Sequence, residues 1–129
     1  MRWRRWIAAA AVSAALGGAG DAVAAVVKHF QVKTTADLVA LCDAQPGSEA
    51  YTAAVNFCEG FGVGAYQYYQ VQTAGDSDSQ FVCVPDPAPT RDQIVDAFVA
   101  WAKAHPQYVD DAPVDGLFRF LGETYPCRR

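Results

Sequence analysis

The sequence predicts an all-α domain, a small disulfide-stapled bundle of about four helices arranged as two helical hairpins. Apolar residues recur at three- and four-residue spacing in four separate segments, which is the pattern of amphipathic helices. No alternating apolar run is long enough to predict a sheet, and the sequence has no internal repeat. Four cysteines among 129 residues supply the expected disulfides.

The first residues have the pattern of a cleavable signal peptide. Three arginines among the first five residues precede an alanine-rich apolar stretch from Ile7 to Gly20. Small side chains at Ala22 and Ala24 predict cleavage after Ala24, with Ala25 as a near-equal choice. A membrane anchor is the alternative, but the stretch is well short of the roughly 20 apolar residues that span a bilayer. We therefore expect export by the Sec route and no anchor on the mature protein.

Cleavage divides the chain into a signal peptide, residues 1–24, and one mature domain, residues 25–129. The mature domain has 7 Lys and Arg against 13 Asp and Glu, a formal net charge of −6. This charge argues against nucleic acid as a partner, because phosphate backbones bind basic surfaces. It is compatible both with simple solubility and with attraction of a basic protein partner.

The first expected helix runs from the pair Thr34 and Thr35 to about Cys42. Either threonine can cap its start, and Asp37 in the first turn complements the helix dipole. The segment 45–47 contains the proline and the glycine that end this helix.

The second expected helix is the longest; it is capped by Ser48 and runs to about Gln70. Its interior holds three glycines, each of which costs up to about 1 kcal/mol relative to alanine. We expect Gly60 and Gly64, four residues apart, to offset this cost by letting another helix approach closely. A membrane dimerisation motif has the same spacing, but this helix contains an acidic residue and many tyrosines. Gly62 is an additional glycine to which we assign no role.

A polar, acidic segment at 73–80, the first acidic loop, follows this helix and leads to a short extended segment at 81–84. Three prolines end the extended segment. Thr90 and Gln93 then form a capping box, which predicts the third helix over Arg91–Ala104.

A second acidic loop, residues 107–112, leads to the last expected helix, from Pro113 to Tyr125. Proline suits the first turn of a helix, where its missing N–H is not needed. Pro126 ends the helix.

The four cysteines are expected to form two disulfides and not a metal site. Their spacings of 16, 25 and 44 residues match no zinc pattern. The short connection between the last two helices makes them antiparallel neighbours, which brings Cys127 back to Cys83. Cys42 and Cys58 lie on the inward stripes of the first two helices and form the second expected pair.

No catalytic, cofactor or metal site is visible in the sequence. Serine-hydrolase, zinc-protease, phosphate-loop and dinucleotide motifs are all absent. Cys58 lies beside Glu59, but no histidine is placed to activate the thiol, and a disulfide is the better interpretation. Tyr66, Tyr68 and Tyr69 are compatible with a binding patch and equally with core positions. We therefore expect a protein that is not an enzyme and uses no cofactor.

The order of several short motifs is similar to that of one family. The motifs are a Cys-x-Gly-aromatic run at 58–61, a Phe-x-Cys-x-Pro run at 81–85 and a terminal Tyr-Pro-Cys at 125–127. Together with the leucine-rich helix that ends in Cys42, they resemble the Tai-type immunity proteins of type VI secretion systems. The resemblance runs from about Asp37 to the last cysteine.

This resemblance implies a small periplasmic protein, often a homodimer, that binds and blocks a peptidoglycan amidase delivered by other bacteria. It implies inhibition and not catalysis. We expect the two acidic loops to cover a basic-rimmed cleft of that amidase; the alternative is that they are ordinary solvated turns. The candidate partner-binding residues are Asp76, Asp78, Tyr108, Asp110 and Asp111.

A second class of function is an exported structural or chaperone-like helical protein with no toxin partner. An exported amidase gene beside this one favours the immunity protein, whereas an isolated gene favours the alternative. An enzyme is the third class, and detection of any turnover would reopen it.

Overall fold

The computed structural model describes residues 27–128, and the expected signal peptide lies outside this range. Within it the chain forms four long helices and two single-turn 3-10 helices. They are α2 (Thr35–Cys42), α3 (Tyr51–Gln72), η1 (Ser77–Ser79), α4 (Arg91–Ala104), η2 (Pro106–Tyr108) and α5 (Pro113–Thr124). The β contact in this part of the chain is a single bridge between Val82 and Pro126. The predicted all-α class is confirmed.

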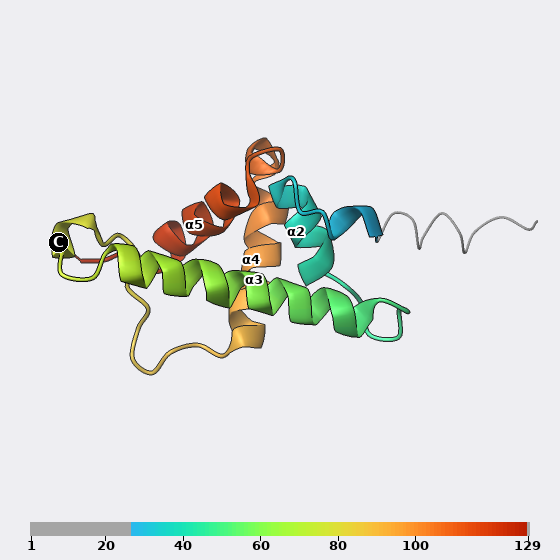
Figure 1. Cartoon of the computed structure of the whole chain (residues 1–129), viewed down its shortest axis with the longest axis horizontal. Coiled ribbons are helices and arrows are strands. Elements are labelled where there is room, and N and C mark those ends of the chain that lie inside the picture. Colours follow the sequence, from blue (N-terminus) through green and yellow to red (C-terminus); the bar gives the residue numbers. More distant parts are fainter. Residues whose placement is uncertain (1–26, 129) are drawn as a thin grey trace, which may run out of the picture.

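The long helix α3 lies across the other three helices (Figure 1). In that view α4 crosses behind α3, and α2 and α5 lie on opposite sides of α4. Although α2 is the shortest of the four, it contacts each of the other three. The fold is therefore organised around a short central helix.

The core forms where these helices face one another. Leu38 and Leu41 of α2 and Phe120 of α5 are each 1% exposed. Leu38 and Phe120 belong to one buried cluster with Phe98 of α4 and Leu117 of α5. Burial of each such side chain is worth about 1.5–3 kcal/mol, so this cluster is the main attraction between helices.

The predicted capping box at Thr90 and Gln93 is confirmed, and of the two threonines expected to cap the first helix Thr34 does so, in a capping box with Asp37. At α2 the N–H of Asp37 donates to Thr34 Oγ1 at 3.2 Å, and the N–H of Thr34 donates to Asp37 Oδ2 at 3.1 Å. Thr90 and Gln93 make the equivalent pair of hydrogen bonds at the start of α4. The capping residues thus mark where these two helices begin.

The predicted cap at Ser48 is wrong. Its hydroxyl donates to the carbonyl oxygen of Gln45 at 2.9 Å, and its N–H donates to the same oxygen at 3.2 Å. The serine therefore closes the turn before α3. The helix begins at Tyr51 without a side-chain cap.

Both expected disulfides are present. Cys42–Cys58 joins the end of α2 to α3, with 5.2 Å between the Cα atoms. Cys83–Cys127 joins the segment before α4 to the tail after α5, with 4.8 Å between the Cα atoms. Both cysteines of the first pair are buried, whereas Cys83 is exposed and Cys127 is half-buried. The N–H of Cys83 also donates to Tyr125 O at 2.8 Å, so the tail is held by the backbone as well.

The predicted close helix approach at Gly60 and Gly64 is wrong within the described chain. Both glycines are exposed, and a Cβ added at either would meet no atom within 4 Å. The buried face of α3 is set instead by Ala54, Cys58 and Tyr69. Because a helix places its residues around a cylinder, the two glycines fall on the outward side.

A close helix approach occurs instead at Gly116 of α5. A Cβ there would lie 2.5 Å from Cγ2 of Thr35 and closer still to its hydroxyl oxygen. Thr35 is 1% exposed and has no room to move. Gly116 lies on the buried stripe of α5 with Leu117 and Phe120. A glycine within an apolar stripe is the sequence signal that could have identified this contact.

Candidate functional site

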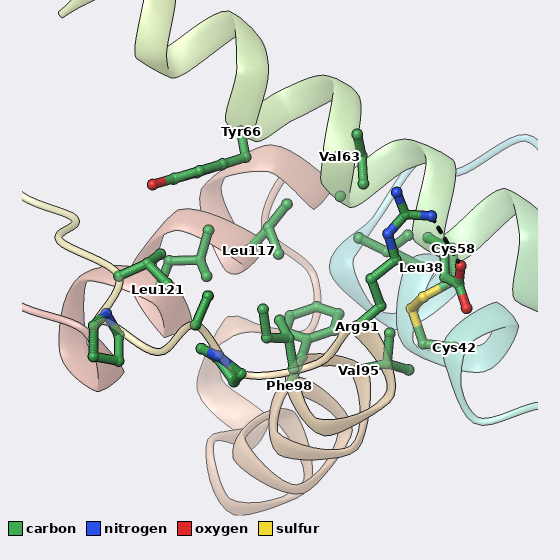
Figure 2. A pocket seen from close by; sticks show the side chains of 17 residues that line it. Leu38, Cys42, Cys58, Val63, Tyr66, Arg91, Val95, Phe98, Leu117 and Leu121 are labelled. Atoms are coloured by element: carbon green, nitrogen blue, oxygen red, sulfur yellow. Dashed lines mark ion pairs between the residues drawn. A yellow bond between two sulfur atoms is a disulfide. The ribbon is translucent and has the colours of Figure 1, made fainter.

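An apolar cavity of about 440 Å³ lies between α3 and α4, with the loop 84–91 along one side (Figure 2). Its volume falls in the range of roughly 300–1,000 Å³ that is usual for binding pockets. The labelled side chains in Figure 2 come from both sides of the cavity and from α5 behind it: Val63, Tyr66, Val95, Phe98, Leu117 and Leu121. This cavity is the first candidate binding site.

Two charged residues line the mouth of the cavity. Glu59 Oε2 and Arg91 Nη1 form an ion pair at 3.6 Å (Figure 2). The side chain of Arg91 is 68% exposed, whereas that of Glu59 is 23% exposed. An exposed pair of this length adds little to stability, so the arginine can leave the carboxylate at small cost.

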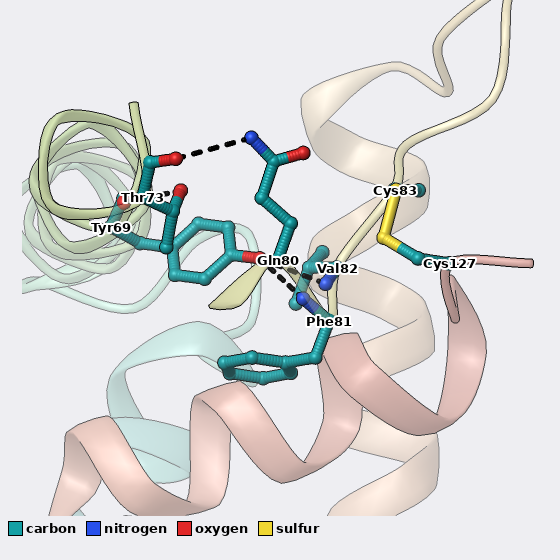
Figure 3. The surroundings of a disulfide bond; sticks show 7 residues. All are labelled: Tyr69, Thr73, Gln80, Phe81, Val82, Cys83 and Cys127. Carbon is teal, nitrogen blue, oxygen red and sulfur yellow. Dashed lines mark hydrogen bonds between the residues drawn. A yellow bond between two sulfur atoms is a disulfide. The ribbon is translucent and has the colours of Figure 1, made fainter. Parts of the chain in front are cut away.

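Beyond the cavity, α3 is attached to the segment before α4 through one tyrosine (Figure 3). The hydroxyl of Tyr69 accepts hydrogen bonds from the N–H groups of Phe81 at 2.8 Å and Val82 at 3.0 Å. Tyr69 is buried, whereas Tyr68 is 66% exposed. Tyr66 lines the cavity and its ring stacks on that of Tyr69, with 6.0 Å between centroids, so these two tyrosines belong to the core and the exposed Tyr68 lies apart from them.

The first acidic loop is a turn closed by its own polar groups. The N–H of Asp78 donates to Asp76 Oδ1 at 3.1 Å. The amide of Gln80 donates to the carbonyl oxygen of Thr73 at 3.3 Å (Figure 3). Both aspartates are exposed, so they are available to a basic partner.

The second acidic loop is hydrogen-bonded to the start of α2. The carbonyl oxygens of Val109 and Asp111 accept from the N–H groups of Ala36 at 2.9 Å and Thr35 at 2.8 Å. The Thr35 hydroxyl also donates to Asp111 O at 3.1 Å and to Ala112 O at 3.2 Å. The first N–H groups of a helix have no partner within it, so the loop satisfies two of them and is fixed in place.

Aromatic and charged side chains gather around Tyr108. The rings of Trp101 and Tyr108 are nearly parallel, 5° apart, with 5.8 Å between centroids, and His105 stacks beside both. The Arg119 guanidinium lies 4.6 Å from the Tyr108 centroid, and its Nε lies 3.5 Å from Asp111 Oδ2. Trp, Tyr and Arg are the residues that dominate binding energy at interfaces. Sequence reasoning missed Arg119, because nothing in its helical spacing marks it.

The two acidic loops lie at opposite ends of α5. The second loop leads directly into Pro113, whereas Phe81, just after the first loop, lies beside Gly122 near the other end. A 12-residue helix is about 18 Å long, so the loops do not form one surface. The structure brings Tyr108, Asp110 and Asp111 together, and Asp76 with Asp78, as two separate sites.

Among residues 27–128 one ionisable group, Asp37 at the start of α2, has a clearly shifted pKa. The hydrogen bond with His29 Nδ1, 3.0 Å from Asp37 Oδ1, lowers the pKa of Asp37. Partial burial opposes this effect, while the N–H groups of Thr34 and Lys33 lower the pKa further. Asp37 is part of the cap of α2, and it lies outside the cavity and both acidic loops.

Residues 27–128 contain no cluster of three or more potential metal ligands. Every cysteine in this range is in a disulfide. The same range contains no helix long and apolar enough to cross a bilayer.

One comparison with known proteins finds a match. The model of a family described as Rap1a immunity proteins matches residues 34–127. Neither a curated protein nor a solved structure matches the chain.

Proposed function

The chain belongs to the Rap1a immunity protein family and is thus an immunity protein against a type VI secretion effector; we propose that this effector is a peptidoglycan amidase. Membership confirms the predicted class, a protein that binds a partner effector. The narrower Tai-type specificity for an amidase stays a prediction.

The observation that carries the proposal is the extent of the family match. Residues 34–127 include all four long helices, both disulfides and both acidic loops. The match therefore includes the cavity and both acidic loops, the candidate contact surfaces of this domain. The amidase itself is supported by the motifs at 58–61 and 81–85, which resemble the Tai-type proteins.

An inhibitor of this kind needs only to cover the cleft of its target. The first loop is held by hydrogen bonds among its own residues and the second by hydrogen bonds to the start of α2, so little conformational freedom is lost on binding. Asp110 is exposed at the tip of the second loop, and Asp111 is paired with Arg119. These carboxylates would attract a basic-rimmed cleft and orient the inhibitor over it.

The periplasm and a homodimer are further parts of this proposal. Two disulfides suit an oxidising compartment. The outward face of α3 carries Gly60 and Gly64 together with Tyr68 and Val71, which are 66% and 71% exposed. An exposed apolar face beside small residues suits a second copy of the chain. Sedimentation velocity of the oxidised protein measures the oligomeric state directly.

Co-expression tests the proposal. An exported amidase encoded beside this gene should lyse cells when it is expressed alone, and co-expression of this chain should prevent lysis. The purified amidase should lose its peptidoglycan activity in a one-to-one mixture with this chain. Lysis that continues despite a folded, exported chain contradicts the amidase as target.

Charge reversal tells which loop contacts the effector. Asp76→Lys with Asp78→Lys changes the first loop, and Asp110→Lys with Asp111→Lys changes the second. Reversal in a contacting loop should weaken binding at least about tenfold, because like charges then meet across the interface. An equal charge change at the exposed Glu49 and Asp96, both replaced by Lys, is the control. A loop whose reversal behaves like this control is a solvated turn.

The alternative function, an exported structural or chaperone-like protein with no toxin partner, predicts no protection against any amidase. It also predicts no saturable one-to-one binding. The same two measurements therefore distinguish it from the proposed function.

A further inference from the structure

We infer that the cavity between α3 and α4 receives a large apolar side chain of the effector, presented on a basic segment of that protein. The inference rests on the proposed function in one respect, that this chain binds an effector. The acidic loops are the first expected contact with the effector. The cavity would be a second contact, in which a side chain of the effector inserts into this chain.

The chain's own side chains do not fill this cavity. Protein interiors are normally packed as densely as organic crystals, with few voids larger than a water molecule. A cavity of roughly 150 Å³ already binds benzene, and this one has a volume of about 440 Å³. Apolar walls offer water few hydrogen-bond partners, so an apolar side chain suits them better than solvent does.

The cavity is held open because α3 is attached to the domain on both sides of it. Cys58 is tied to α2 by a buried disulfide, and Tyr69 binds the backbone of Phe81 and Val82 through its hydroxyl. Between these two points α3 faces α4 across the cavity (Figure 2). Closing the space would require breaking one of these attachments.

Gly62 contributes to the width of the cavity. It lines the space between the two attachment points, and a Cβ added there would meet no atom within 4 Å. A glycine inside a helix is unfavourable relative to alanine. No neighbouring atom in the described part of the chain comes close enough to exclude a side chain at Gly62. The missing side chain leaves room for a group from outside the chain.

The charges at the mouth favour a basic segment. Glu59 is only 23% exposed, and a partner that covers the mouth would remove more water from its carboxylate. A covered carboxylate needs a cation beside it. Arg91 is largely exposed and can be displaced by a lysine or arginine of the partner. Asp92 follows Arg91 directly and Asp86 belongs to the loop along the cavity, and both are exposed, so they add negative charge near the mouth.

The first acidic loop is close enough for the same partner to contact. Tyr66 at the cavity precedes Thr73 at the start of that loop by seven residues, about 10 Å along the helix axis. The cavity is lined by the first turns of α4, whereas the second loop follows the other end of that helix. An effector anchored at the mouth of the cavity beside Arg91 can therefore also contact Asp76 and Asp78.

A filled cavity tests the inference. Gly62→Leu places a side chain into the cavity, and isothermal titration with the co-expressed amidase measures binding. We expect affinity to fall at least about thirtyfold, the loss typical of a central interface contact. Gly62→Ala is the matched control, which adds one methyl group and should stay within about threefold of wild type. Ala88→Trp, at the exposed rim of the cavity, is a second blocking variant that leaves the helices untouched.

The charge at the mouth is tested separately. Glu59→Gln should weaken binding about tenfold, whereas Arg91→Gln should leave it unchanged or strengthen it, because the partner's cation replaces the arginine. Folded Gly62→Leu and Ala88→Trp variants that bind like wild type overturn the inference while leaving the proposed function intact. A wild-type chain that binds no amidase removes the proposed function itself and this inference with it.

Discussion

Single residues decide how closely α2 and α5 approach. Thr35 is buried, and its hydroxyl donates to two carbonyl oxygens of the second acidic loop. Gly116 lies against this threonine with no room for a side chain. The glycines of α3 differ, because a Cβ added at any of them would meet no atom within 4 Å. The same residue type therefore has opposite energetic roles in two helices.

Alanine substitution should reveal this difference. Gly116→Ala forces a methyl group against Thr35 and should destabilise the domain by about 1–3 kcal/mol. Gly62→Ala meets open space and should stabilise it by up to about 1 kcal/mol through helix propensity. Urea unfolding followed by circular dichroism measures both changes. If Gly116→Ala also raised the free energy of unfolding, the contact between Gly116 and Thr35 would have room for a methyl group.

At the scale of elements, the start of α2 collects several polar contacts. Asp37 accepts from the N–H groups of Lys33 and Thr34, and it also pairs with His29. Backbone carbonyl groups of the second acidic loop satisfy two further N–H groups of the same turn. The shortest helix is thus stabilised at its end by residues both near and far in sequence.

This cap should make stability depend on acid pH. The pKa of Asp37 is lower in the folded state, chiefly through His29, so its ionised form favours folding. The contribution is complete above the ordinary pKa of aspartate, about 4, and is lost as pH falls through the lowered folded value.

Asp37→Asn should remove that part of the acid dependence and should cost about 1 kcal/mol at neutral pH. Urea midpoints measured from about pH 6 down to about pH 2.5, a window that brackets the ordinary aspartate pKa, reveal the effect. Asp96→Asn on the exposed face of α4 is the control. Parallel curves for wild type and Asp37→Asn would contradict a role for Asp37 in the acid transition.

At the scale of the whole molecule, two disulfides connect the helices into one unit. One is buried between α2 and α3, and the other is partly exposed where the tail meets the segment before α4. Chain-entropy estimates assign about 3 kcal/mol to the 16-residue loop and about 4 kcal/mol to the 44-residue loop. These amounts are large beside the roughly 5–15 kcal/mol that stabilise a typical domain.

Reduction under native conditions should open the two bonds in order. Cys83–Cys127 should be reduced first, because it is accessible to a thiol from the side of Cys83 while Cys42 and Cys58 are both buried. Alkylation and peptide mapping at increasing dithiothreitol measure the order. Simultaneous loss of both disulfides would show that opening requires global unfolding.

Much of the fold was predictable from local features. Apolar spacing located the four helices, the pair Thr34 and Thr35 marked one start, and Thr90 with Gln93 marked another, because a capping box involves only residues three apart. The disulfide pairs followed from helix order and short connections. Ser48 was mistaken for a cap because its hydroxyl has a second local acceptor in the preceding turn.

The candidate site was predictable only in part. Asp76 and Asp78, and Tyr108 with its neighbouring aspartates, were identified as polar loop residues by composition alone. Their separation by the length of α5, and the contact of Arg119 with Tyr108, depend on how helices cross and leave no periodic signal.

By itself the sequence determined the helices, their order and the cysteine pairs, since each depends on residue type and on spacing within or between adjacent segments, and its resemblance to a known family implied the immunity class. The tertiary structure alone decided three things: that Gly116 and not Gly60 or Gly64 lies at a helix contact, that the acidic loops are two sites, and that Gly62 borders a cavity. The physical reason is that volume and contact between distant helices are properties of packing in three dimensions, which a linear pattern does not contain.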